Sequence, residues 1–149
     1  MGCEWQTVET DADVEQLLSR FGGFHDGCLR EVHIWTGTWV SEDRAMHFPP
    51  NLDTHVRVLF QRQWLDPSAV ELLFDAVTGF FLSPANLNDI YDAALFISEG
   101  TIYWADWCEW RPDCLDRDGC TWIAARKLYW RDASKWMGEQ LRYGPGRES

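Results

Sequence analysis

The first strong pattern of hydrophobic positions has the period of an α-helix and lies in residues 10–21. Its apolar side chains follow the spacing i, i+3, i+4 and i+7, which gathers them on one stripe of a helix. They are Val14, Leu17, Leu18 and Phe21. Thr10 can cap the first turn with Asp13 three residues on, as in a capping box, and Gly22-Gly23 can end the helix because glycine tolerates positive φ.

After this helix, hydrophobic and polar positions alternate, which is the period of a β-strand. Strand-like runs cover residues 28–40, 54–64, 69–76, 80–82, 93–98, 101–107 and 120–130. Gly37 predicts a bulge in the first run, and Thr78-Gly79 predicts a tight turn before residues 80–82. The best hairpin signal is Glu99-Gly100, a two-residue turn between two of these runs.

Two segments interrupt or follow the strands. Residues 41–53 contain Pro49-Pro50 and are predicted to form a polar loop, whereas residues 132–141 are predicted to form a short helix. On the last strand, strict alternation predicts one common face for Trp122, Ala124, Arg126, Leu128 and Trp130.

These elements predict an α+β fold that is mainly antiparallel β, with an N-terminal helix. About 6–7 short strands joined by turns indicate a meander. A bent sheet, a sandwich and a partly open barrel all fit, and periodicity alone does not choose among them. We expect one domain over residues 1–141 and a flexible tail over residues 142–149, which contain Gly144-Pro145-Gly146.

The chain has 149 residues, enough for one domain with a substantial core, and a formal net charge of −11. This acidity argues against a nucleic-acid partner, which needs a basic surface. It permits a basic protein partner, although solubility is the plainer explanation. We expect no membrane association, because no run approaches the ~18–20 apolar residues of a membrane span.

The five cysteines are odd in number, and the N-terminus has neither a basic region nor an apolar stretch typical of a secretory signal. These features favour a cytoplasmic protein with reduced thiols. Cys108, Cys114 and Cys120 are spaced six apart, without the C-x₂₋₄-C spacing of structural zinc sites. We therefore expect no metal and no other cofactor.

The stretch Phe24-His25-Asp26 joins the predicted helix to the first predicted strand. A histidine and an aspartate here can act as a general base or a ligand pair at a sheet edge. Alternatively, His25 packs on the helix end while Asp26 caps free backbone N–H groups, and this structural interpretation is favoured. No nucleophile motif or phosphate-binding loop accompanies the pair, so no catalytic residue is assigned.

Tryptophan is abundant, with ten residues, and several stand near acids after the predicted hairpin turn. One strand face there carries Trp104 and Asp106, and the other carries Tyr103 and Trp107. One face must be core, and the other is either a contact surface or covered by the helix or tail. Asp106 needs a partner, for which Arg62 and Arg126 are the candidates. The candidate binding residues are thus His25, Asp26, Arg62, Trp104, Asp106, Trp107 and Glu109.

The order of these features resembles an uncharacterised family of small bacterial proteins with no assigned activity. The likeness covers residues 10–131 and rests on the apolar helix, Phe24-His25-Asp26, Leu29-Arg30-Glu31 and the runs at residues 57–63, 102–106 and 128–131. The helix-to-strand entry also resembles immunity proteins of bacterial polymorphic toxin systems. The resemblance implies a cytoplasmic bacterial protein that is not an enzyme, and it provides no catalytic residues.

Three functions follow in order of preference. The first is a non-enzymatic binding protein, an immunity-type inhibitor that masks a basic toxin through Asp106, Trp107 and Glu109. The second is a small-molecule or peptide-binding β-module with a Trp-lined pocket. The third is a hydrolase or metal enzyme that uses His25 and Asp26. Homo-oligomer formation through the aromatic face is compatible with all three.

Overall fold

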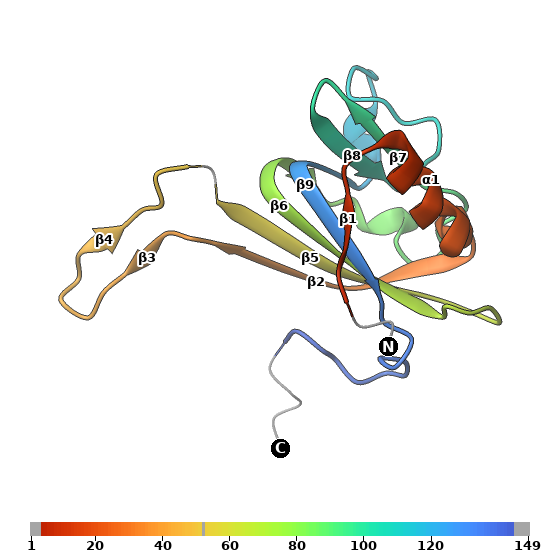
Figure 1. Cartoon of the computed structure of the whole chain (residues 1–149), viewed down its shortest axis with the longest axis horizontal. Coiled ribbons are helices and arrows are strands. Elements are labelled where there is room, and N and C mark those ends of the chain that lie inside the picture. The colour runs from red at the N-terminus through yellow and green to blue at the C-terminus, as the bar shows by residue number, and fades with distance from the viewer. Residues whose placement is uncertain (1–3, 52, 145–149) are drawn as a thin grey trace.

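In the described residues, 4–51 and 53–144 of a computed structural model, seven strands form one antiparallel sheet (Figure 1). Their order is β2–β5–β6–β9–β8–β7, and β1 pairs separately with β9. The strands are β1 (Gln6–Val8), β2 (Gly27–Thr36), β5 (Thr54–Arg62), β6 (Ala69–Phe81), β7 (Ala94–Ser98), β8 (Thr101–Ala105) and β9 (Trp122–Asp132). The predicted α+β, mainly antiparallel class is confirmed, and the sheet is open rather than closed into a barrel.

Two runs of neighbouring strands, β2–β5–β6 and β7–β8–β9, meet where β6 pairs with β9. The outer edge of β9 is shared by two partners. Strand β8 pairs with residues 122–125 of β9, and β1 pairs with residues 128–130. The sheet therefore divides at this edge, where β1 and the β7–β8 hairpin separate.

Helix α1 (Asp11–Arg20) begins with the predicted capping box. The backbone N–H of Asp13 donates to Thr10 Oγ1 at 3.2 Å, and the N–H of Thr10 donates to Asp13 Oδ2 at 3.1 Å. Gly22 and Gly23 follow with φ of +60° and +64°, as a helix-ending glycine pair requires. The predicted helix and both of its boundary signals are confirmed.

The main core lies between α1 and one face of the sheet. Val56, Val58 and Phe60 all point into it, as their alternation predicts. The rings of Phe24 and Trp104 pack on Phe60 at centroid distances of 4.9 Å and 5.0 Å. Burial of these large rings makes Trp104 a core residue rather than a surface contact.

The other face of the sheet carries charged side chains beside a small apolar cluster around Leu59, and the C-terminal segment (residues 133–144) packs on it. The fully buried carboxylate of Glu71 accepts hydrogen bonds from Arg131 Nε at 2.7 Å and from the Tyr143 hydroxyl. Glu31 accepts from the backbone N–H groups of Arg142 and Tyr143 at 2.7 and 2.9 Å. The segment is thus fixed to the sheet by two carboxylates.

This segment corrects two expectations. The short helix predicted for residues 132–141 does not form, because β9 continues to Asp132 and irregular backbone follows. Arg142 and Tyr143, assigned to the tail from the sequence, are instead bound to Glu31 and Glu71. Residues 145–149, the rest of the predicted tail, lie outside the described residues.

The predicted turn at Thr78-Gly79 is wrong, because β6 continues through it to Phe81. The register against β9 shifts between Val77 and Gly79 instead. The reason is a distant contact: a Cβ at Gly79 would lie 2.7 Å from the ring of Trp122. Glycine is required here for close ring packing rather than for a turn.

The two other local predictions on strands also need correction. The bulge expected at Gly37 lies between Leu29 and Glu31, and Gly37 instead donates its N–H to the Asp53 carbonyl at 3.0 Å. The single face expected for β9 is split. Trp122 packs beside Trp110, whereas Leu128 and Trp130 lie in the main core.

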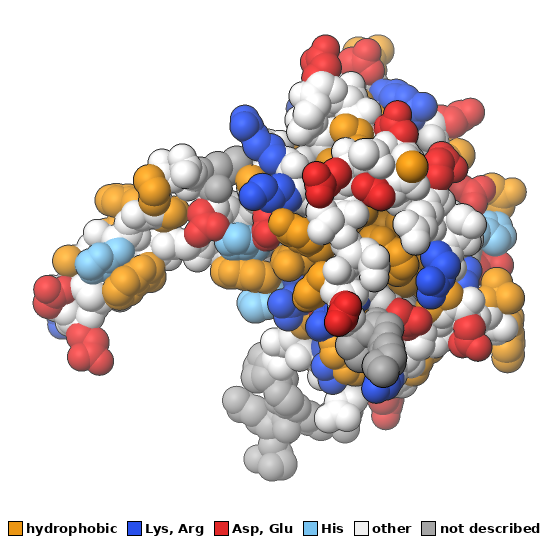
Figure 2. All heavy atoms as spheres, in the orientation of Figure 1, with side chains coloured by type: hydrophobic (Ala, Val, Ile, Leu, Met, Phe, Trp, Pro, Cys, Tyr) orange, Lys and Arg blue, Asp and Glu red, His pale blue; other side chains and the backbone are white. Residues whose placement is uncertain are grey.

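The predicted polar loop at residues 41–53 belongs to a projecting structure. Strand β3 (Trp39–Val40) pairs with β4 (Met46–His47) to form a second, two-stranded sheet. We call residues 37–51 the ribbon. Figure 1 shows that it extends away from the body, and Figure 2 shows hydrophobic side chains along it with acidic ones at its end.

We predict that Glu71→Gln destabilises the protein by about 2 kcal/mol or more, because it leaves the half-buried guanidinium of Arg131 without its carboxylate partner. Urea denaturation at pH 7 measures this free energy. Glu99→Gln, an exposed change in the β7–β8 turn, is the matched control and should change stability by less than about 0.5 kcal/mol. Equal stability of the two variants would contradict the role given to Glu71.

Candidate functional site

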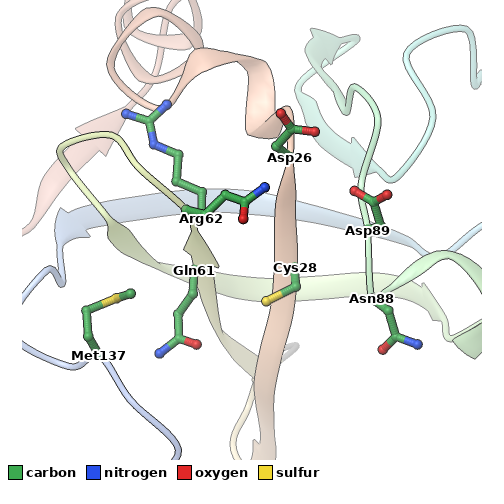
Figure 3. Close-up of a pocket in the computed structure, with 8 residues that line it drawn as sticks. Asp26, Cys28, Gln61, Arg62, Asn88, Asp89 and Met137 are labelled. Carbon is green, nitrogen blue, oxygen red and sulfur yellow. The ribbon is translucent and has the colours of Figure 1, made fainter.

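The candidate site is a hollow of about 450 Å³ beside the start of β2 (Figure 3). Three stretches of chain form most of it: the entry into β2, the end of β5 and residues 88–89. Met137 of the C-terminal segment completes the wall. The lining residues are Asp26, Cys28, Gln61, Arg62, Gln63, Asn88, Asp89 and Met137. Asp26 and Arg62 are the two lining residues among the candidates that the sequence predicts.

Arg62 supports the structure at this site. Its Nε donates to the Pro67 carbonyl at 2.8 Å, and one terminal nitrogen donates to the carbonyls of Asp66 and Arg20 at 3.1 and 3.3 Å. The guanidinium also lies over the ring of Phe21, 4.7 Å from its centroid. Burial lowers the pKa of Arg62, although the charge of Asp66 opposes this. Figure 3 shows the guanidinium directed away from Asp26 and Asp89.

His25 links the entry of β2 to the segment that follows residue 89. Its Nδ1 donates to the Tyr91 carbonyl at 2.5 Å, while Nε2 lies 3.4 Å from Asp26 Oδ2. The hydrogen bond to Tyr91 and the charges of Asp26, Asp92 and Asp89 raise the pKa of His25, against a smaller effect of burial. His25 therefore has a structural position, but its ring packs against Tyr91 rather than on the helix end expected from the sequence.

Asp26 occupies a constrained backbone position. Its φ is +58°, and its backbone N–H donates to the Ile90 carbonyl at 2.9 Å. Its carboxylate was expected to cap free N–H groups, but its polar contact among the described residues is with His25. The carboxylate therefore remains available at the hollow.

The hollow consequently has an acidic character. Asp26 and Asp89 line it, and the guanidinium of Arg62 is already committed to three carbonyls. The amides of Gln61, Gln63 and Asn88 add hydrogen-bonding groups, although Gln61 Nε2 is used by the Trp136 carbonyl at 2.9 Å. Such a surface can accept hydrogen bonds from an ammonium or guanidinium group.

The predicted acid-and-Trp surface near residues 104–109 is divided by the fold. Trp104 is fully buried, and Asp106 is only 5% exposed. Thr121 donates its N–H to Asp106 Oδ2 at 3.3 Å, whereas Oδ1 has no hydrogen-bond partner among the described residues. The expected partner arginines, Arg62 and Arg126, are not bound to it. Burial raises the pKa of Asp106.

Trp107 and Glu109 remain on the surface, with Trp107 41% exposed. They belong to the loop between β8 and β9 and do not line the hollow. The seven candidate residues thus fall into three places: the hollow and its rim, the interior, and this loop.

The described residues hold no cluster of three or more His, Cys, Asp or Glu side chains suited to a metal ion. The histidines are separated along β2 and β5. His25 precedes β2, whereas His55 lies opposite Trp35 near the far end of that strand. Nor is any helix in the described part of the chain long and apolar enough to cross a bilayer.

Comparison with known proteins adds no assignment: no family model, no curated protein and no solved structure matches this chain. The resemblance to a bacterial family and to immunity proteins therefore stays a prediction.

Most lining residues of the hollow were missed by sequence reasoning. Gln61, Gln63 and Asn88 are polar residues at a strand end and in a turn, where polar side chains are ordinary. Met137 was assigned to a helix that does not form. No spacing within the sequence relates these positions to Asp26.

His55 should make stability depend on pH. Its Nε2 and Nδ1 lie 2.5 Å from Asp53 and 2.6 Å from Asp75, and only an imidazolium can donate through both nitrogens. Burial opposes the charged form, but the hydrogen bond and charge of Asp75 and the contact with Asp53 outweigh it and raise the pKa of His55. The stabilisation is therefore complete below the unfolded pKa and is lost as pH rises through the folded one.

Thermal unfolding of the protein and of His55→Gln between pH 5.5 and 9 measures this effect. We expect the difference in Tm to be largest at the acid end and to shrink as the pH increases. A difference that stays constant over this range would show that His55 is not charged in the folded protein.

Asp106 should also make the protein less stable as the pH rises, but over a more acidic range than His55. Because burial raises its pKa, the ionised carboxylate costs stability once the pH exceeds the unfolded pKa. Asp106→Asn keeps an oxygen that can accept from Thr121 but cannot ionise, so the stability of this variant relative to the unmodified protein should be higher at pH 7 than at pH 4. Urea denaturation at both pH values measures this, and a relative stability that does not rise between them would contradict it.

Proposed function

We propose that this chain is a non-enzymatic, cytoplasmic binding protein that recognises a basic protein through the acidic hollow. An immunity-type inhibitor of a bacterial toxin is the form of this function that we favour. The observation that carries the proposal is that the hollow presents two carboxylates without an arginine or lysine of the described residues bound to them. Asp26 and Asp89 line it, while the guanidinium of the one arginine beside them donates through Nε and Nη2 to backbone carbonyls and is directed away from both carboxylates (Figure 3).

The distribution of charge over the molecule supports the same kind of partner. The net charge is −11, and acidic side chains are spread over the visible face of the body in Figure 2. Such a field accelerates the encounter with a basic protein. The local site then supplies specificity, because a lysine or arginine side chain inserted between Asp26 and Asp89 exchanges water for charge-assisted hydrogen bonds.

A small molecule is the second candidate, favoured by the volume of the hollow. About 450 Å³ lies within the ~300–1,000 Å³ typical of ligand pockets. The polar lining differs from the apolar, Trp-lined pocket that the sequence suggested. A small ligand here would carry an amine or guanidinium group, since the same carboxylates would bind it.

The test uses the immobilised full chain and a lysate of its own organism, with elution at high salt. The variant Asp26→Asn with Asp89→Asn removes both carboxylates of the hollow. Glu15→Gln with Glu99→Gln removes the same charge at exposed positions elsewhere and is the matched control. Trp107→Ala with Glu109→Gln tests the surface originally favoured from the sequence.

We expect one basic protein to be retained by the unmodified chain and by the control. After its purification, calorimetry should show affinity reduced by about tenfold or more for the Asp26 and Asp89 variant. Retention of no protein, or equal affinity for that variant and the control, would contradict the proposal. Weakening only by the Trp107 and Glu109 variant would move the site to the loop after β8.

A further inference from the structure

The ribbon exposes apolar side chains that a monomer in water leaves uncovered. Trp39, Val40, Met46 and Phe48 are each more than half exposed. Across the two strands Val40 pairs with Met46, whereas Trp39 pairs with His47 and stacks on its ring at a centroid distance of 4.2 Å. The two pairs therefore lie on opposite faces of the ribbon, and both faces expose apolar side chains. Exposed apolar side chains concentrated on one projecting element indicate an interface.

A second uncovered feature lies on the body, at the outer edge of β9. Between the partners β1 and β8, the described residues offer no strand beside Arg126 and Lys127. A notch of about 440 Å³ occupies this place. We call it the β9 notch. Its apolar lining residues are Ile97, which is half-buried, and the buried core residues Val8, Ile102 and Leu128. It combines an apolar wall with unpaired strand edge, which is what an added strand requires.

The charges of the ribbon and the notch are complementary. The turn between β3 and β4 carries two acids and one base, and the notch carries two bases and one acid. The turn has Glu42, Asp43 and Arg44, and the notch has Arg126, Lys127 and Glu9. None of these six forms an ion pair with another residue in the described part of the chain.

The ribbon of one molecule does not fill its own notch. Figure 1 shows the ribbon directed away from the body, whereas β1, β8 and β9 lie within the body. From Thr36 to Asp43 the chain advances seven residues, a reach of roughly 20 Å at ~3.3 Å per residue. That length projects the apolar side chains toward another molecule.

From these observations we propose that the protein forms a two-fold symmetric dimer in which each ribbon docks into the β9 notch of the other copy. Apolar side chains of the ribbon cover Ile97, and the acidic turn meets Arg126 and Lys127. The arrangement is isologous, so each copy supplies one ribbon and one notch, and the contacts close without further growth.

The first test is the mass of the purified full chain by sedimentation over about 1–200 µM. We expect a mass approaching twice 17.4 kDa as concentration rises. Trp39→Ser with Phe48→Ser should weaken dimerisation at least about tenfold. Leu115→Ser, at a fully exposed leucine outside both surfaces, is the matched control and should leave the dimer unchanged. Circular dichroism verifies that each variant is folded.

A charge exchange makes the test specific to this pairing. A ribbon variant, Glu42→Lys with Asp43→Asn, makes the net charge of the turn positive. It keeps the side-chain oxygen at position 43 that accepts from the Ala45 N–H at 3.2 Å. A notch variant, Arg126→Glu with Lys127→Gln, makes the net charge of the notch negative. Each variant alone should be monomeric, because the ribbon of one copy and the notch of an identical copy then carry charge of the same sign and repel one another. An equimolar mixture should recover the dimer, since both contacts in the mixed dimer are again attractive.

A monomer at every concentration would overturn the proposal, and so would a dimer that the ribbon variants leave unchanged. Failure of the mixture to recover the dimer would also overturn it. A chain that stays monomeric and binds a different protein through its ribbon would overturn the proposal as well. Because the experiment uses the purified chain alone, its outcome is separate from that for the acidic hollow.

Discussion

Most of this architecture depends on the hydrogen bonds that the buried carboxylate of Glu71 accepts from Arg131 and Tyr143. Glu71 stands in the middle strand pairing of the sheet, on the face opposite the apolar core. A buried charge is costly unless it is paired and hydrogen-bonded. The C-terminal segment supplies part of that pairing, so packing of this segment on the sheet and burial of Glu71 stabilise each other.

The shape of the candidate site depends on the same C-terminal segment. Once Glu31 and Glu71 hold the C-terminal segment, Trp136 accepts from Gln61, and Met137 completes a wall of the hollow. The opposite wall comes from the entry of β2, which His25 and the Asp26 backbone tie to residues 90–91. Recognition at the hollow therefore depends on two segments that are far apart in the sequence. The ribbon belongs to neither, which leaves it free to engage a separate surface.

Local signals predicted the elements that depend on neighbouring residues. The helix follows from its stripe and its Thr10–Asp13 capping box, and the hairpin follows from Glu99-Gly100, whose φ values are +52° and +79°. Errors arose where a distant contact decides the structure. Gly79 stays within β6 because the ring of Trp122 packs on it. The sequence predicted two lining residues of the candidate site, Asp26 and Arg62. It did not predict that Arg62 donates to backbone carbonyls, because no sequence pattern indicates such contacts.

Hydrogen exchange at the backbone amides of Arg142 and Tyr143 tests the dependence on Glu71 most directly. Both amides donate to Glu31, so they should exchange slowly in the unmodified chain although they lie near the end of the described residues. In Glu71→Gln they should lose protection together with the amides around Met137, while those of α1 remain protected. Protection of both amides that is unchanged in Glu71→Gln would contradict the account.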